Sequence, residues 1–419
     1  MNSNRHSAHM INHGMVTDDA RPELADRRLT EPAADGPELI ISSVEAFPLT
    51  LTGDGRPDPD GPRYQVGRNR PTIYPTGRET LYVRIETASG HVGWGEALAP
   101  AAPRVPAAIV TDLLAPALLG ADAAAVRPLR YRLGELMRER GHLLGHQADA
   151  LAAVDIALWD LLGRATGLSV ATLLGGPYRR EIPSYVTSVA GSTDAERAET
   201  VVRLIDGGAR RFKLHLGNGV EADLRTFDTV AEAARARLPE AALAVDAHCV
   251  YDGSDALRLA RELGARGAWF LESALPAEHL HGYAELAARA DLPIAGGEAF
   301  RHRFEVAQWL REDALDYYQP DIGRTGITEG LAIAELVNAA YRPILPHHSA
   351  ALGVALVAGL HVAAAAQNAP CFEYGPATVA AADRLLTTPI EARPDHYPLP
   401  CGPGLGVTVD EAAVRAAAH

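Results

Sequence analysis

The sequence predicts an α/β protein built around a TIM-like barrel. From residue 182 onward, eight short apolar runs alternate with amphipathic helical stretches at a spacing of about 25 residues. This alternation favours a (β/α)8 barrel over an open sheet. The chain has 419 residues, of which 47% are hydrophobic, so it can bury such a core together with a second domain.

The residues before the barrel predict a separate α+β unit. Residues 1–37 are polar and lack helical or strand periodicity, which is typical of a disordered extension. Alternating β-branched runs at 38–51 and 79–98 predict strands, and the second run contains a hairpin turn. Helical periodicity follows from about 106 to 177.

A long Gly/Pro-rich segment over 52–75 separates the two strand runs of this unit. Loops of this length inside a domain are usually disordered or functional. Because it carries Arg68 and Arg70, we expect a lid that covers an anionic substrate.

The barrel elements follow in order. The predicted strands lie at 182–189, 210–217, 242–248, 268–275, 293–298, 316–322, 343–348 and 371–375. The helical stretches that separate them include 194–207, 222–237, 254–265 and 327–341. Because the last residues no longer follow this alternation, we expect a barrel domain over 179–375 and a capping domain over 38–178 that is completed by 376–419.

The composition excludes several classes of partner. A formal net charge of -14 argues against nucleic acid or an anionic membrane surface, because binding to either requires clustered Lys and Arg. Cys249, Cys371 and Cys401 are too few and too scattered for a disulfide framework. The sequence contains neither an apolar run of about 18 residues nor a signal peptide, so we expect a soluble, cytoplasmic protein.

Ionisable residues stand at the ends of nearly all predicted barrel strands. In chain order they are Lys213, His215, Asp246, His248, Glu272, Glu298, Asp321, His347, His348 and Glu373. Charged groups gathered at one rim repel and desolvate one another unless something binds them. In barrels of this type the active residues lie at this C-terminal rim.

Three of these acids predict a divalent metal site. Asp246, Glu272 and Glu298 follow one another at equal steps of 26 residues, one βα unit each, so their side chains are expected at the same height. Hard oxygen ligands that converge on one point suit Mg²⁺ with positions left for water and substrate. The sequence shows no close set of His or Cys ligands beside them, which disfavours zinc.

Histidines supply the acid and base candidates. His248 could be a metal ligand, but we favour an acid–base role because imidazole titrates near neutrality. Asp321 precedes a histidine pair on the next strand, and a carboxylate beside an imidazole fixes the tautomer of a general base. In a regular strand His348 shares a face with Pro346 whereas His347 points away, so we favour His348 as the base.

Lys213 is the only lysine in the chain, against 38 arginines. A lysine that persists in such a background indicates a task that a guanidinium cannot perform, such as exchanging a proton or placing a compact charge in a tight site. Chance survival at a surface position is the alternative.

On these motifs the sequence resembles the enolase superfamily, and within it the mandelate racemase-like group. The motifs are the three acids, "GWGEAL", "AVDIALWDLLGRATGLSVATLLGG", Lys213-Leu214-His215-Leu216-Gly217, "QPDIGRTGITEG" and "PGLGVTVDE". The resemblance implies a modified (β/α)7β barrel under an α+β cap, one Mg²⁺ per subunit and a homo-oligomer, from dimer to octamer. It also implies removal of the proton α to the carboxylate of a small-molecule substrate.

Details of the motifs point to a sugar acid. Asp246-Ala247-His248 resembles the version of the family that dehydrates aldonic or aldaric acids to 2-keto-3-deoxy acids, with His248 protonating the departing β-hydroxyl. Lys213 would neutralise the substrate carboxylate and Glu373 would hydrogen-bond the intermediate. The family's Lys-x-Lys is here Lys213-Leu214-His215, and its Glu-Glu-Pro is Glu272-Ser273-Ala274.

Two other functions stay open on the sequence. A racemase or epimerase of a 2-hydroxy acid would use the same half-reaction, with His215 or Lys213 as the second base. A barrel that binds metal and ligand without turnover is the third possibility.

Overall fold

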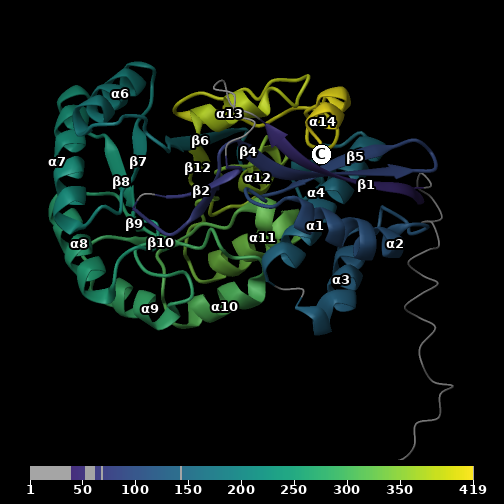
Figure 1. The fold of residues 1–419 in the computed structure, drawn as a ribbon, viewed down its shortest axis with the longest axis horizontal. Coiled ribbons are helices and arrows are strands. Elements are labelled where there is room, and N and C mark those ends of the chain that lie inside the picture. Colours follow the sequence, from purple (N-terminus) through teal and green to yellow (C-terminus); the bar gives the residue numbers. More distant parts are fainter. Residues whose placement is uncertain (1–38, 52–61, 68, 142–143, 419) are drawn as a thin grey trace, which may run out of the picture.

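The computed structural model describes residues 39–51, 62–67, 69–141 and 144–418. These ranges do not include the predicted extension over 1–37, residues 52–61 of the predicted loop, or Arg68. Within them, an α+β cap lies beside a barrel sheet that is wrapped by helices and consists of seven parallel strands and one antiparallel strand (Figure 1).

The cap is built on a three-stranded antiparallel sheet of order β1-β4-β5. Its strands are β1 (Ile41–Leu51), β4 (Arg78–Thr87) and β5 (Val92–Ala97), and the last two form the predicted hairpin. Its helices are α1 (Arg104–Ile109), η2 (Val110–Leu114), α2 (Ala115–Leu118), α3 (Val126–Met137), η3 (Arg138–Arg140), α4 (Gly145–Thr166) and α5 (Val170–Leu173).

The glycines of "GWGEAL" allow helix α4 to lie directly on strand β5. A Cβ atom at Gly93 would collide with the carbonyl oxygen of Ala157, and one at Gly95 with that of Ala153. Both positions therefore need a residue without a side chain, which is why α4, buried from Ala148 to Leu161, can pack this closely.

The barrel strands follow in the expected order. They are β6 (Glu181–Val186), β7 (Arg211–His215), β8 (Ala242–Asp246), β9 (Leu271–Glu272), β10 (Ile294–Gly296), β11 (Tyr317–Tyr318) and β12 (Phe372–Tyr374). The helices between them are α6 (Asp194–Asp206), α7 (Val220–Arg237), α8 (Gly253–Ala265), α9 (Leu280–Arg289), α10 (Arg303–Arg311), α11 (Ile322–Ala339) and α12 (Val354–Ala365). Strand β12 pairs parallel with β6, so the sheet curves back onto its first strand.

The predicted strand at 343–348 differs from the others. It joins the barrel only through isolated parallel bridges, which pair Tyr318 with Ile344 and Asp321 with His347. Pro343 and Pro346 lack the N–H groups that a regular ladder requires. The segment is therefore irregular just where the histidine pair lies.

The end of the chain returns to both parts of the fold. Helix α13 (Pro376–Ala382) follows β12, and β13 (His396–Pro398) pairs antiparallel with β6. Helix α14 (Glu411–Ala417) lies against β1, where Arg415 forms an ion pair with Glu45 at 3.1 Å. Among the helices of the described ranges, none combines the length and apolar character needed to cross a membrane.

The cap also holds the loop that follows the histidine pair. Glu96, buried at the end of β5, accepts hydrogen bonds from the backbone N–H groups of Leu352 and Ala355. Burial raises the pKa of Glu96 to about 7, against these hydrogen bonds, which lower it. Glu96 thus joins the cap to the barrel segment that directly follows the histidine pair.

Part of the segment predicted as a loop is a hairpin. Strands β2 (Tyr64–Val66) and β3 (Ile73–Pro75) pair antiparallel and extend from the cap toward the barrel (Figure 1). The expectation of a long loop over 52–75 is therefore wrong for residues 64–66 and 73–75. The strands were missed because each has only three residues.

Candidate active site

The strand ends bring the predicted ionisable residues to one rim of the barrel. In the parallel register, His215 stands opposite Asp246, and Asp246 stands opposite Glu272. Glu298 follows two residues after the end of β10, and Asp321 is the N-cap of α11. Adjacent strands of a parallel sheet end at the same edge, so the side chains converge there.

Lys213 lies inside the barrel between two acids. Its side chain is 1% exposed, and its Nζ lies 2.8 Å from Oε1 of Glu272 and 2.8 Å from Oε1 of Glu373. Burial alone would lower the pKa of Lys213, but the two carboxylates raise it well above its ordinary value. The lysine is therefore a charged, buried residue, and the alternative of chance survival at the surface is wrong.

Two of the predicted metal ligands are buried carboxylates with raised pKa values. Burial is the largest cause for both: it raises the pKa of Asp246 to about 6 and that of Glu272 to about 8, although Lys213 lowers both. A buried acid with too little positive charge nearby tends to protonate. A divalent cation would remove this cost, and carboxylate oxygens are the donors that Mg²⁺ prefers, so the residues fit such an ion.

Other donors hold two of the three acids in this structure. Glu272 accepts hydrogen bonds from Lys213 and, at 2.6 Å, from Nε2 of Gln319. Oε2 of Glu298 lies 3.0 Å from Nε2 of His347. Burial would raise the pKa of Glu298, but the charges of His347 and Arg324 lower it below its ordinary value.

A tight group of possible ligands forms around Asp246. Among the residues that the structure describes, His215, Asp246 and His248 place their ligand atoms within 4.8 Å of one another. The expectation of no close histidine ligands beside the acids is therefore wrong. The sequence could not show this, because His215 comes from the neighbouring strand β7.

The two histidines of this group differ in their contacts. His248 Nδ1 lies 3.3 Å from Oδ2 of Asp246, and the two imidazole rings meet edge to face with centroids 4.8 Å apart. His215 Nε2 lies 2.9 Å from the hydroxyl of Thr187. His248 has a φ of 51°, so it follows the strand in a left-handed conformation rather than continuing it. Burial lowers the pKa of His248 to about 3, and both imidazoles are therefore neutral.

His347, not His348, is the partner of Asp321. His347 Nδ1 lies 2.7 Å from Oδ2 of Asp321, and its Nε2 faces Glu298. Burial would lower the pKa of His347, but Glu373, Glu298 and Asp321 raise it well above its ordinary value. An imidazole held this way has the orientation of a general base, and it can accept a proton only when its Nε2 is unprotonated.

The structure therefore contradicts the expected pairing of His348 with Asp321. The ring of His348 stacks against Phe372 with centroids 6.4 Å apart, and burial lowers its pKa to about 4. The alternation that favoured it holds only in a regular strand. Here the bridge between Asp321 and His347 decides which ring faces the acid.

The remaining predicted residues have defined places. Glu373 lies at the centre of the site: it binds Lys213 and accepts a hydrogen bond from the backbone N–H of His348 at 3.0 Å. Burial would raise the pKa of Glu373, but Lys213 and His347 lower it to about 2. Its alternative, a salt bridge to the cap, is wrong because its cationic partner Lys213 belongs to the barrel. Arg70 lies on the hairpin that reaches the barrel rim.

The reasoning from sequence missed two side chains that orient the site, Gln319 and Thr187. Gln319 stands two residues before Asp321, and such spacing puts both side chains on one side of an extended segment. That signal was present in the sequence. Thr187 follows β6 and carried no signal that distinguishes it from other threonines.

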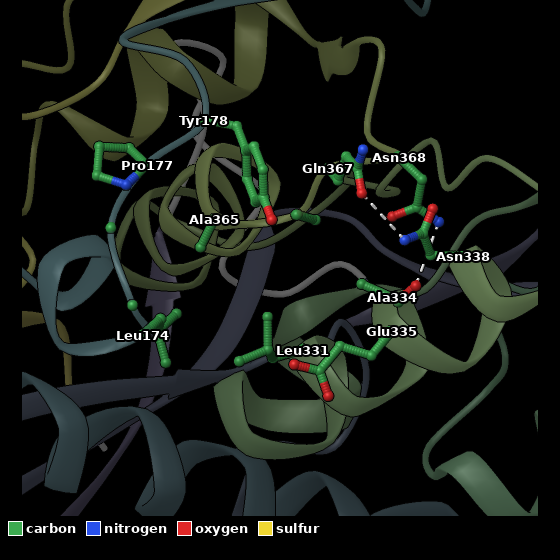
Figure 2. A pocket seen from close by; sticks show the side chains of 13 residues that line it. Leu174, Pro177, Tyr178, Leu331, Ala334, Glu335, Asn338, Ala365, Gln367 and Asn368 are labelled. Atoms are coloured by element: carbon green, nitrogen blue, oxygen red, sulfur yellow. Dashed lines mark hydrogen bonds between the residues drawn. The ribbon is translucent and has the colours of Figure 1, made fainter.

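A cavity also lies away from the ionisable rim and does not compete with it as the reaction site. It measures about 470 Å³ and lies between the segment before β6, the end of α11 and the end of α12 (Figure 2). These segments lead into strands, so the cavity is at the barrel end opposite to the ionisable rim. Its polar side chains include Asn338, Gln367 and Asn368, and none of the predicted site residues lines it.

Comparison with known proteins agrees with this geometry. Residues 196–413 match the family described as Enolase C-terminal domain-like, and residues 76–175 match the N-terminal domain of mandelate racemase / muconate lactonizing enzyme. The chain belongs to the enolase superfamily. The modified TIM-like barrel with an α+β cap is the superfamily fold that the sequence motifs predicted.

Most of the chain is similar to superfamily members that have a named activity or a solved structure. It is 32% identical to the D-galactarolactone cycloisomerase of Agrobacterium fabrum over 80% of this chain and 90% of that protein. It is 30% identical to the arabinonate dehydratase of Saccharolobus solfataricus over 79% and 88%. An enolase superfamily member from Agrobacterium tumefaciens superposes with a TM-score of 0.84 at 31% identity, covering 90% of this chain and 98% of that one.

Proposed function

We propose that this protein is a Mg²⁺-dependent lyase that removes the proton α to a carboxylate and dehydrates a sugar acid to a 2-keto-3-deoxy acid. The observation that carries the proposal is the pairing of His347 with Asp321 beside a cluster of buried carboxylates and one buried lysine. Its relatives at about 30% identity include a sugar acid dehydratase. The base pair, the carboxylates that would hold the cation and the lysine are together the groups needed to remove a proton from carbon and stabilise the negative charge that forms.

Asp246, Glu272 and Glu298 would hold the cation. When bound, it would supply positive charge opposite the substrate carboxylate, where negative charge develops as the proton leaves. Lys213 adds a second positive charge from inside the barrel, since it stays protonated between Glu272 and Glu373. A compact ammonium suits this position because two carboxylates already fill the space around it.

The protein's side chains move the protons. Nε2 of His347, once it has released its own proton, takes the α-proton, while Asp321 keeps the Nδ1–H of the same ring in place. His248, across the site beside Asp246, is neutral in the free site, so it must bind a proton before it can donate one to the β-hydroxyl as the carbon–oxygen bond breaks and water leaves. The enol that remains tautomerises to the 2-keto acid, so one water is lost and no oxidant is needed.

A racemase or epimerase is the second candidate. The imidazoles of His215 and His248 stand next to each other, apart from the pair formed by His347 and Asp321. Two separate sets of acid–base groups could exchange a proton on opposite faces of one carbon. The cycloisomerase among the relatives supports an isomerase as the alternative.

We also propose that the substrate is a small-molecule carboxylate, without nucleic acid or membrane as a partner, and that the protein is a cytoplasmic homo-oligomer. Superfamily membership supports the oligomer, which light scattering after size-exclusion chromatography would measure.

One screen tests the proposed reaction. The protein is incubated with Mg²⁺ and a library of aldonic and aldaric acids in D₂O, and products are followed by NMR and by keto-acid detection. Dehydration gives a 2-keto-3-deoxy acid. Exchange of the α-hydrogen with inversion and without a keto product would assign an epimerase instead. If no acid in the library shows either change, the proposed function is wrong.

A further inference from the structure

The hairpin of β2 and β3 is held to the cap at its base. Arg63 Nε lies 2.6 Å from Oε1 of Glu79, and the hydroxyl of Tyr64 lies 2.9 Å from Oε2 of the same carboxylate. Glu79 is buried in the cap sheet. Two contacts to one buried acid give the base of the hairpin a defined position on the cap.

The tip of the hairpin lies on the barrel rim. Nδ2 of Asn69 donates hydrogen bonds to the carbonyl oxygens of Leu216 at 3.4 Å and Gly217 at 3.5 Å, directly after strand β7. Along β7, Lys213 lies deepest and His215 lies at the strand end. The hairpin therefore covers the outer end of the site, away from the buried lysine.

Arg70 is placed at this outer end without an anionic partner. Its guanidinium lies over the ring of Tyr74, 5.1 Å from the centroid, and its Nε is buried without a hydrogen bond. The described residues form no ion pair with it, unlike Arg63 on the same hairpin. A partly buried guanidinium is costly unless an anion binds it, and a planar fork matches a carboxylate best.

We infer that Arg70 binds a second carboxylate of the substrate, so that the preferred substrate is an aldaric acid, a sugar diacid, rather than an aldonic acid. The inference rests on the proposed function, which assigns the first carboxylate to the metal-binding acids and Lys213. That carboxylate lies deep in the barrel, whereas Arg70 lies at the rim. The two cationic groups thus receive the two ends of one extended molecule.

The protein can distinguish the two classes of acid by whether the guanidinium of Arg70 finds an anionic partner. An aldonic acid ends in a primary alcohol, which leaves the guanidinium without its charged partner. A charge-assisted pair at this position is expected to favour the diacid by roughly 10- to 100-fold. Because the contact is far from the reacting carbon, most of the effect should appear in KM rather than in kcat.

The test compares acids that differ only at the distal carbon. Galactarate is compared with galactonate, and glucarate with gluconate, by kcat/KM and by calorimetric dissociation constants in Mg²⁺. The variants are Arg70→Gln, Arg70→Lys, which keeps the charge, and Arg63→Gln, which loosens the base of the same hairpin. We expect the wild type to prefer the diacid, Arg63→Gln to lose part of that preference because the hairpin is held less firmly, Arg70→Gln to lose at least 10-fold of it, and Arg70→Lys to keep part of it.

Two results would overturn the inference: a wild type that binds both members of each pair equally or prefers the aldonic acid, or an Arg70→Gln variant that weakens both members alike. The dissociation constants separate this inference from the proposed reaction. A diacid preference in binding that depends on Arg70, without turnover of any acid, would disprove the reaction and retain the role of Arg70.

Discussion

Replacing His347 with Asn should nearly abolish proton removal, whereas the same change at His348 should not. Asn keeps polarity but cannot accept the α-proton. A positioned base contributes about 10²- to 10⁴-fold, or roughly 3–5 kcal/mol of barrier. We expect the upper part of this range, because Asp321 at 2.7 Å orients the ring and supports its positive charge. His348 packs on Phe372, so its loss should cost stability and change the exchange rate by less than about 5-fold.

The assay is the exchange of the α-hydrogen in D₂O, followed by NMR on the substrate that the screen identifies. Denaturant midpoints of both variants show whether each is folded at the assay temperature. Because the two histidines are adjacent and both buried, His348→Asn controls for the loss of a buried imidazole at this place in the fold. Exchange that survives in His347→Asn and disappears in a folded His348→Asn would refute the assignment of the base.

Three further predictions concern charge, pH and packing. Lys213→Arg should lower kcat/KM by roughly 100-fold and the free energy of unfolding by about 1–3 kcal/mol. The reason is that the larger guanidinium must fit where the lysine side chain is only 1% exposed. Wild-type values for both quantities would contradict this prediction. Burial lowers the pKa of His361, which accepts a backbone N–H at Nδ1, to about 4. The neutral ring therefore contributes fully to the free energy of unfolding above its ordinary pKa of 6.5, and up to about 3 kcal/mol is lost as the pH falls toward 4. In urea unfolding from pH 8 to 4, the free energy of unfolding should decline more steeply for wild type than for His361→Gln. Gly95→Ala should destabilise the cap by about 2–4 kcal/mol, because its Cβ would meet the carbonyl of Ala153, and an unchanged thermal midpoint would show that α4 can move away.

The barrel and most of its rim could be predicted because they rest on periodicity. The apolar runs and the 26-residue steps between Asp246, Glu272 and Glu298 placed these acids at consecutive strand ends. Helix α12 could not be found the same way. Its 12 residues are all buried, so it has no polar face and no helical period in hydrophobicity.

The finer geometry of the site depends on contacts between distant segments. Asp246 gathers His215 from β7 and His248 from its own strand end, and sequence spacing carries no information about the first of these. The hairpin tip with Arg70 meets the rim through Asn69, almost 150 residues before its partners Leu216 and Gly217.

The sequence by itself therefore determined the fold class and the acids at the strand ends, because strand alternation and βα repeats are local patterns with a fixed geometric meaning. The resemblance of its motifs indicated the family, and its composition marked the single lysine. Only the tertiary structure decided which histidine faces Asp321. The prolines at 343 and 346 interrupt the ladder, so the side-chain alternation that would assign the ring from sequence no longer holds, and the bridge between strands determines it instead.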